Sequence, residues 1–265
     1  MNKTDPEVIV AIFAFTAFWL MVVLVILVLG KHFPKLDQFK GQMLSMWKPA
    51  LIISIIFTAC QTLAGNSLIN PYTMAIFCQA MLGLAIASYI PGFEPLPLSQ
   101  AIHRRQKVAQ EIGLLLGIAL LAVLPALLIG TVGLNIGKQL FGEADYTSQA
   151  ASSLLTTNKW LVFFSALGGA GIAEETTYRL VSLSLVWKLT HRKWLAIVIS
   201  SMIFGAYHLT PLTGMYQIFW QFPISQFIAS TLIGLVWGYV YTKRGFGTAV
   251  LGHAFSDWLP LMLFT

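Results

Sequence analysis

Six ionisable side chains stand inside long apolar stretches of the sequence, in three separate segments. Such groups are costly in a membrane, so by default they indicate function. A carboxylate beside an imidazole can take a proton from water and hold the water for attack, which is the chemistry of hydrolysis. The same residue types also mark proton and ion paths in transporters. The six residues are Glu174, Glu175, Arg179, His208, His253 and Asp257.

Counting along helices predicts that these groups lie at similar depths. Each segment has a basic residue at one end, and Glu174 is about 14 residues from it, His208 about 15, Asp257 about 13 and His253 about 9. At a rise of about 1.5 Å per residue these depths are ~21, ~22, ~20 and ~14 Å. We therefore expect the side chains to converge on a polar cavity near the middle of the membrane.

Spacing within the first segment separates two neighbouring glutamates. Glu175 and Arg179 are four residues apart, so they share a helix face and are predicted to form an ion pair. Glu174 lies on the adjacent face and is left without that partner. The small residues 168–171 precede it and allow neighbouring helices to approach closely.

The other two segments repeat the four-residue spacing. Phe204 and His208 are spaced so that the phenyl ring can support the imidazole. His253 and Asp257 are spaced so that the carboxylate can accept a hydrogen bond from one ring nitrogen and fix the tautomer. We expect a water between Glu174 and His208, with His253 as the donor to the oxyanion. This chemistry would hydrolyse a peptide bond and requires no cofactor.

The composition places this chemistry in a lipid environment. Of 265 residues, 57% are hydrophobic and only 10% are charged, far below the quarter or so of charged residues in a soluble domain. The 16 Lys and Arg residues exceed the 10 Asp and Glu residues, but they are spread through short loops and form no nucleic-acid-binding block. The chain is predicted to be an all-α integral membrane protein that contacts the lipid bilayer and no nucleic acid.

Eight apolar segments are long enough, or nearly so, to cross a bilayer, which needs about 20 residues per helix. No loop has room for a soluble domain, so residues 1–265 are predicted to form one transmembrane domain, a bundle of about eight helices with a buried polar active-site cavity. The predicted spans are Glu7–Gly30, Pro49–Ile69, Tyr72–Ile90, Ile112–Gly137, Trp160–Leu189, Trp194–Leu209, Gln217–Tyr241 and Phe246–Phe264.

Basic residues predict the orientation. The loops after the first, third, fifth and seventh spans carry Lys and Arg, whereas the intervening loops are bare or balanced. The positive-inside rule then places both termini on the non-cytoplasmic side, and we expect the cell (inner) membrane. Cys60 and Cys78 lie inside apolar runs and are predicted to be buried and unpaired.

At its polar residues the sequence resembles the CAAX protease and bacteriocin-processing (CPBP, or Abi) family of intramembrane proteases. The three family signatures are a double Glu with Arg, a Phe with His, and a His with Asn or Asp. They stand here as EETTYR at 174–179, FGAYH at 204–208 and HAFSD at 253–257. The resemblance extends from about Trp160 to the end of the chain, whereas residues 1–159 match only in being hydrophobic.

The resemblance implies roles for these residues. It makes Glu174 the general base and His208 its partner in holding water, and it gives Glu175, Arg179 and Phe204 structural or substrate-orienting roles. His253 and the residue at position 257 would line the oxyanion site. Asp stands there where some members have Asn, and because an ionised Asp cannot donate, we expect Asp257 to serve His253. The substrate would be a membrane-associated peptide or protein, with prenylated CAAX-type C-termini as one class.

Two alternatives remain open at this level. Glu174, His208, His253 and Asp257 would also suit zinc, with water in an open coordination position. In the non-enzymatic alternative, the cluster would be an ion or proton path in a transport protein, or the chain would be a family member that acts as a bacteriocin-immunity or scaffold protein without catalysis. The absence of an internal repeat argues against common inverted-repeat transporters. The sequence does not fix the oligomeric state.

Overall fold

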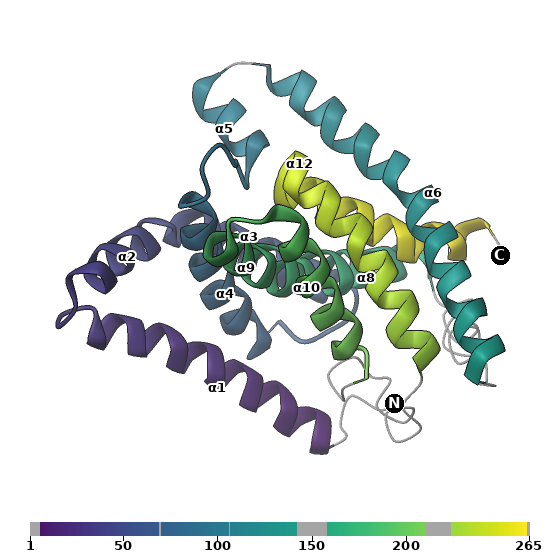
Figure 1. Ribbon diagram of the computed structural model, residues 1–265, viewed down its shortest axis with the longest axis horizontal. Helices are drawn as coiled ribbons and strands as arrows, with labels where there is room; N and C mark the ends of the chain where they lie inside the picture. The colour runs from purple at the N-terminus through teal and green to yellow at the C-terminus, as the bar shows by residue number, and fades with distance from the viewer. Residues whose placement is uncertain (1–5, 69, 106, 142–157, 210–223, 264–265) are drawn as a thin grey trace.

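The computed structural model describes residues 6–68, 70–105, 107–141, 158–209 and 224–263. Every regular element in these ranges is helical, as predicted (Figure 1). The elements are α1 (Pro6–Leu29), α2 (Pro34–Ser45), α3 (Trp47–Leu63), α4 (Tyr72–Ser88), α5 (Pro97–Arg104), α6 (Val108–Phe141), α8 (Lys159–Ala166), η1 (Leu167–Glu174), η2 (Thr176–Leu183), α9 (Ser184–Thr190), α10 (Lys193–Tyr207) and α12 (Ile224–Leu263).

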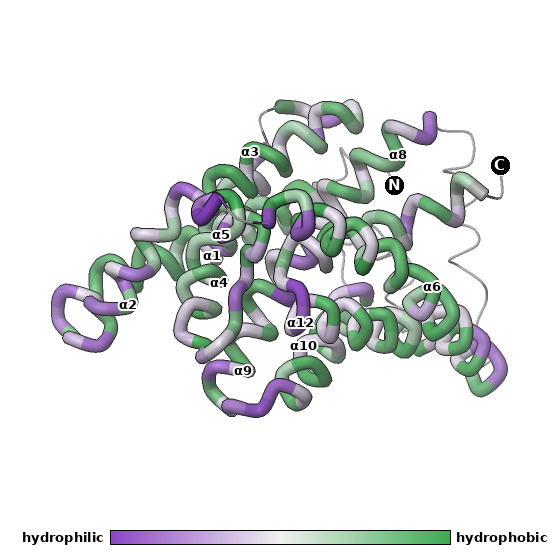
Figure 2. The backbone as a smooth tube through the Cα atoms, turned by 90° about the horizontal axis from the view of Figure 1, so that it is seen from above, coloured by the Kyte–Doolittle hydropathy of each residue, from purple (hydrophilic) through white to green (hydrophobic). Residues whose placement is uncertain are grey.

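Three helices are long and apolar enough to cross a bilayer by length and composition: Ile9–Leu29, Val108–Phe141 and Ile224–Pro260. A fourth span results if α2 and α3, which meet at a bend of 49°, are counted as one. Figure 2 shows α6 as apolar along most of its length. The chain is therefore an integral membrane protein, as predicted.

The count of eight spans stays a prediction. Helices occupy at least part of all eight predicted segments, but the element boundaries differ. The fifth segment is divided among α8, η1, η2 and α9 because its turns widen in the middle, and the seventh and eighth segments are joined in α12. Residues 217–223 of the predicted seventh span, together with Ile69 and Phe264 at the ends of two others, lie outside the described residues.

A sharp break at Gly245 divides α12 where the sequence predicts the end of one span and the start of the next. Gly245 has φ 76° and ψ −175°, a conformation that side chains with a Cβ rarely adopt. A Cβ there would lie 2.7 Å from the Pro95 carbonyl oxygen and 2.6 Å from Pro97 Cδ. The Pro95 carbonyl also accepts a hydrogen bond of 2.8 Å from the Phe246 amide. The loop before α5 thus fixes the break, and with it the direction of the half of α12 that carries His253.

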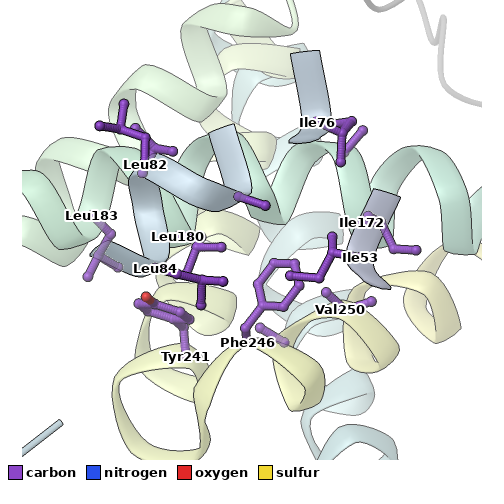
Figure 3. Packing of buried hydrophobic residues seen from close by; sticks show 14 of the residues in the cluster. Ile53, Ile76, Leu82, Leu84, Ile172, Leu180, Leu183, Tyr241, Phe246 and Val250 are labelled. Carbon is purple, nitrogen blue, oxygen red and sulfur yellow. The ribbon is translucent and has the colours of Figure 1, made fainter. Parts of the chain in front are cut away.

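Helix α4 is the most enclosed element of the fold. Nearly all residues from Ala75 to Ala87 are buried, so this helix is apolar on all sides because it has neighbours on all sides. It packs against α1, α3 and η2. Figure 3 shows Leu84 beside Leu180 and Leu183, next to Tyr241 of α12. Cys60 and Cys78 are buried and unpaired, which confirms their predicted state.

The connection between α4 and α5 brings several basic segments to one side of the molecule. The Phe93 ring lies 5.2 Å from the Trp187 ring of α9 and 5.0 Å from the Tyr241 ring of α12. At the end of α4, the Tyr89 carbonyl accepts a hydrogen bond of 2.9 Å from Lys188 Nζ. The ends of α4 and α9 and the α12 break therefore meet.

Two further contacts extend this arrangement to α2 and α6. Arg244 at the α12 break pairs with Glu111 near the start of α6, with 2.7 Å between Nη2 and Oε2. Gln42 of α2 donates a hydrogen bond of 3.0 Å to Ser88 at the end of α4. All four basic segments that the sequence assigns to the cytoplasm thus lie around the same end of the bundle.

Candidate active site

The double glutamate stands where two π-helical segments meet. Glu174 ends η1, and η2 begins after Glu175. The wide turns have side-chain support, because Thr176 Oγ1 donates to the Ile172 carbonyl at 2.6 Å and Thr177 Oγ1 to that of Ala173 at 3.0 Å. Ser and Thr often bind the preceding turn in this way, and π turns occur frequently at functional sites.

Glu175 and Arg179 form the predicted ion pair. Arg179 Nε lies 3.2 Å from Glu175 Oε2, and neither side chain has exposed surface. The guanidinium carbon lies 4.8 Å from the centre of the Phe204 ring, which is a cation–π contact. Both charges therefore lie behind the site, where each offsets the cost of burying the other.

His253 lies between the two glutamates. Its Nδ1 donates to Glu175 Oε1 at 2.9 Å, while Nε2 lies 3.9 Å from Glu174 Oε2. The Trp237 ring stacks on the imidazole with centroids 5.8 Å apart and planes 21° apart, and Phe204 meets it edge-on at 5.6 Å. Contacts from three sides fix the ring and direct Nε2 toward Glu174.

The partner of Nδ1 differs from the predicted one. The sequence predicts that Asp257 binds one ring nitrogen of His253, but Glu175 binds Nδ1 because the end of η1 packs directly on this part of α12. Asp257 is exposed and accepts a hydrogen bond of 3.4 Å from Ser256. It remains within electrostatic range of Glu174 and both histidines, so it belongs to the same cluster.

His208 has the predicted aromatic wall. The Phe204 ring meets it edge-on with centroids 4.6 Å apart. His208 Nδ1 donates to the Phe204 carbonyl at 2.9 Å. In the neutral ring this leaves a lone pair on Nε2, which can accept a hydrogen bond from water. Phe204 contacts both imidazoles, so α10 and α12 bring them to one place.

Glu174 is the more accessible of the two glutamates. Its side chain is 18% exposed, whereas that of Glu175 has no exposed surface. Glu174 interacts electrostatically with His253, Glu175 and Arg179, and no hydrogen bond joins its carboxylate to any described residue. The chain thus separates a buried, paired carboxylate from an accessible one, as the spacing predicts.

Close helix contacts at small residues hold these elements together. A Cβ on Gly171 would lie 2.9 Å from the Val250 carbonyl oxygen of α12, and one on Gly168 would lie 2.7 Å from Gln61 Nε2 of α3. Gly252, directly before His253, leaves room for the Trp237 ring. The predicted close approach is confirmed at residues 168 and 171, whereas Gly169 has open space beside it.

Three residues near the site do not stand out in the sequence. The sequence predicts Trp237 to be a packing or interface residue, although its ring stacks on His253. Gln79 of α4 is fully buried and accepts a hydrogen bond of 3.0 Å from Thr177. Tyr72, at the start of α4, interacts electrostatically with Glu174. Gln79 could have been found in the sequence, because it is a polar residue inside an apolar run. Nothing in the sequence distinguishes the two aromatic residues from aromatic residues that only pack.

The arrangement of possible ligands bears on the zinc alternative. Among the residues that the structure describes, no group of three or more His, Cys, Asp or Glu side chains is arranged to hold a metal ion. No catalytic step is therefore assigned to a metal.

The fold and the site define a helical integral membrane protein with an acid–imidazole cluster among its helices. Residues 156–259 match a protein-family model described as Rce1-like, type II CAAX prenyl endopeptidase. The matched part contains every residue of the cluster, and it confirms the predicted resemblance to CAAX proteases. A comparison with curated proteins gives no match, nor does a comparison with solved structures.

Proposed function

We propose that the protein is an intramembrane endopeptidase that hydrolyses a peptide bond with a water activated by Glu174. The observation that carries the proposal is the position of His253, between a buried glutamate at 2.9 Å and an accessible one at 3.9 Å. The family match over residues 156–259 supports the same class of reaction.

In the proposed reaction, a water binds between the Glu174 carboxylate and His208 Nε2. Glu174 takes one proton, and the water oxygen bonds to the carbonyl carbon of the scissile peptide as the carbonyl oxygen becomes negative. Collapse of the tetrahedral intermediate breaks the carbon–nitrogen bond, and Glu174 returns the proton to the leaving amine. A carboxylate with little water around it is a stronger base than a surface one, which suits Glu174 to this step.

The buried groups have supporting roles. Glu175 holds His253 through Nδ1, and Arg179 balances the charge of Glu175. A neutral His253 with its proton on Nδ1 has a lone pair at Nε2, so it donates to an oxyanion only as an imidazolium. Because Glu175 orients the ring, Asp257 is free to contact water or substrate at the accessible edge of the site.

The substrate we propose is a membrane-associated peptide or protein, and a prenylated CAAX-type C-terminus is the class that the family description names. The test is cleavage of a prenylated CAAX peptide by purified protein, with the unlipidated peptide as control. We expect wild-type protein to release the C-terminal fragment and Glu174→Ala to release none. Equal product from both proteins would contradict the proposal.

We also propose that both termini face away from the cytoplasm, in the cell (inner) membrane. The four basic segments lie around one end of the bundle, joined by contacts such as Lys188–Tyr89 and Arg244–Glu111. Because the native cysteines are buried, a single cysteine replacing Lys107 would be the reactive one. We expect a membrane-impermeant maleimide to label it in inside-out vesicles and not in intact cells. Labelling of intact cells would contradict this orientation.

A further inference from the structure

A polar side chain lies in the middle of the most enclosed helix of the fold. Gln79 of α4 has no exposed surface, and the residues around it from Ala75 to Ala87 are apolar. Its amide oxygen accepts a hydrogen bond of 3.0 Å from Thr177, whereas its amide nitrogen has no hydrogen-bond partner among the described residues. A buried donor without a partner costs free energy. An apolar side chain of similar size would be at least as stable here, so stability alone does not explain the glutamine.

Close packing of α4 on η2 fixes the place of Gln79. Gly83 meets Leu180 so closely that a Cβ on the glycine would lie 2.8 Å from the leucine backbone. One turn earlier on both helices, Gln79 meets Thr177. The two helices therefore run side by side in the same direction, and the approach at Gly83 keeps the amide within reach of the Thr177 hydroxyl.

Thr177 links Gln79 to the backbone of Glu174. The Thr177 hydroxyl has a single proton, which two acceptors share: the Gln79 amide oxygen and the Ala173 carbonyl, each at 3.0 Å. The Ala173 carbonyl belongs to the planar peptide bond that joins Ala173 to Glu174. Two hydrogen bonds in series thus connect the amide of Gln79 with the peptide that precedes the proposed general base.

The bond to another helix is the one that distinguishes a wide turn from an ordinary one. A threonine that bonds to the carbonyl four residues earlier is also common in α-helices, so the bond from Thr177 to Ala173 would survive if the turn tightened. The bond to Gln79 is anchored on α4 and would be lost if Thr177 rotated away. Gln79 therefore favours the wide turn in which Glu174 stands.

Two helices outside the fifth segment hold the double glutamate. On α12, His253 binds the carboxylate of Glu175. On α4, Gln79 acts through Thr177. The Glu174 carboxylate makes no hydrogen bond to a described residue, so its direction depends on the backbone that these two bonds hold.

We propose that Gln79 is a positioning residue of the reaction: through Thr177 it holds the wide turn that directs the Glu174 carboxylate toward Nε2 of His253 and toward the attacking water. This role rests on the proposed peptidase function. Gln79 neither touches the substrate nor transfers a proton, and its effect reaches the reaction only through the direction of Glu174. It lies outside the matched residues 156–259, so the proposal gives the N-terminal helices a part in the reaction.

The test measures cleavage of the prenylated peptide by Gln79→Met, which keeps the side-chain length and removes both polar atoms. Thr177 keeps the Ala173 carbonyl as its acceptor. We expect an unchanged or higher Tm, because the volume is conserved and a buried donor without a partner is removed. A misplacement of about 1 Å lowers a rate about 10²-fold, so we expect kcat to fall by about tenfold or more, with little change in KM. A merely structural role would instead lower Tm and leave kcat of the folded protein unchanged.

Gln42→Met is the matched control. Gln42 of α2 donates a hydrogen bond of 3.0 Å to the Ser88 hydroxyl, which itself donates to the Ala85 carbonyl at 2.7 Å. The same kinds of group thus occur in series, but at the C-terminal end of α4 and not beside the glutamates. We expect the wild-type kcat. An equal loss in Gln42→Met and Gln79→Met would overturn the proposal, because the loss would then follow from a loosened α4.

Variants of Thr177 test the same link from the other side. Thr177→Ser keeps the hydroxyl and should retain most of the wild-type kcat, whereas Thr177→Val should lose about as much as Gln79→Met. Because the two residues act as a unit, the double variant Gln79→Met/Thr177→Val should lose no more than either single variant. Losses that multiply, or equal kcat values for Thr177→Ser and Thr177→Val, would overturn the proposal.

The double variant also decides the question if Gln79→Met has a lowered Tm. It replaces both partners by apolar groups, an exchange that leaves stability nearly unchanged or raises it. A wild-type Tm with a low kcat would support the role of Gln79, and a wild-type kcat would overturn it.

The remaining outcomes distinguish the two proposals. Full activity of Gln79→Met, with an inactive Glu174→Ala, would overturn the role of Gln79 and leave the peptidase function standing. Cleavage that does not depend on Glu174, or no cleavage by the wild-type protein, would overturn the peptidase function and the Gln79 role with it.

Discussion

His253 Nδ1 lies 2.9 Å from Glu175 Oε1, and this bond makes two adjacent glutamates unequal. Glu175 is buried, paired with Arg179 and bound to the imidazole, whereas Glu174 is accessible and faces Nε2 of the same ring. One glutamate therefore positions the histidine, and its neighbour is available for the reaction.

Asp257→Asn is predicted to retain substantial activity, within about tenfold of the wild-type kcat/KM. Because Glu175 binds Nδ1, the substitution leaves the orientation of His253 unchanged, and one neutral hydrogen bond corresponds to about 1 kcal/mol. Peptide cleavage by purified Asp257→Asn and Glu174→Ala checks this. Complete loss in both variants, with unfolding curves like that of the wild type, would contradict the division of roles.

Glu175→Gln is predicted to lower stability strongly. The amide oxygen can still accept from His253, but the positive charge of Arg179 is left buried without a counter-charge. Breaking a buried ion pair by removing one partner costs about 3–5 kcal/mol. Thermal unfolding in detergent should show a much lower Tm, and the double variant Glu175→Gln/Arg179→Met should recover part of it. A double variant less stable than Glu175→Gln would contradict this account.

Gly245→Ala is predicted to reduce both stability and kcat. The φ of 76° and the nearby Pro95 carbonyl oppose a Cβ, and a residue held in such a conformation costs about 1–3 kcal/mol. Relief of the strain would redirect the half of α12 that carries His253. Gly113→Ala in α6 is the control, because a Cβ there meets nothing within 4 Å. Equal Tm values for Gly245→Ala and the wild type would show that the break does not need glycine.

Chelation is predicted to leave peptide cleavage unchanged, because the proposed mechanism uses Glu174 and no metal. Elemental analysis of purified protein should find zinc well below one equivalent. Activity before and after treatment with a strong chelator is the measurement. A loss that added zinc restores would establish the metal-dependent alternative.

Much of the architecture was readable from the sequence because its signals are local. The four-residue spacing of Glu175 and Arg179 predicts their ion pair, and that of Phe204 and His208 predicts the ring contact. The apolar runs predict helices, and the basic residues near position 244 predict the break in α12. Each of these inferences depends on residues within one or two turns of each other.

The remaining features depend on contacts between distant segments. Nothing within α12 indicates that His253 prefers Glu175 to Asp257, because that choice follows from how η1 packs on α12. Gln79 stands 98 residues before Thr177, and only the packing of α4 on η2 brings the two side chains together. The sequence also does not predict the wide turns around the glutamates, because spacing arguments assume α-helical geometry.

Those wide turns make the site sensitive to chain length as well as to residue type. A π segment accommodates up to one more residue per turn than an α-helix would, so deleting a single small residue between Leu167 and Ala173 would let one of these turns close to α-helical geometry. The deletion would keep both carboxylates in the polypeptide and rotate them away from the imidazole. Related chains that vary in length here would therefore lose the geometry even where every polar residue is preserved.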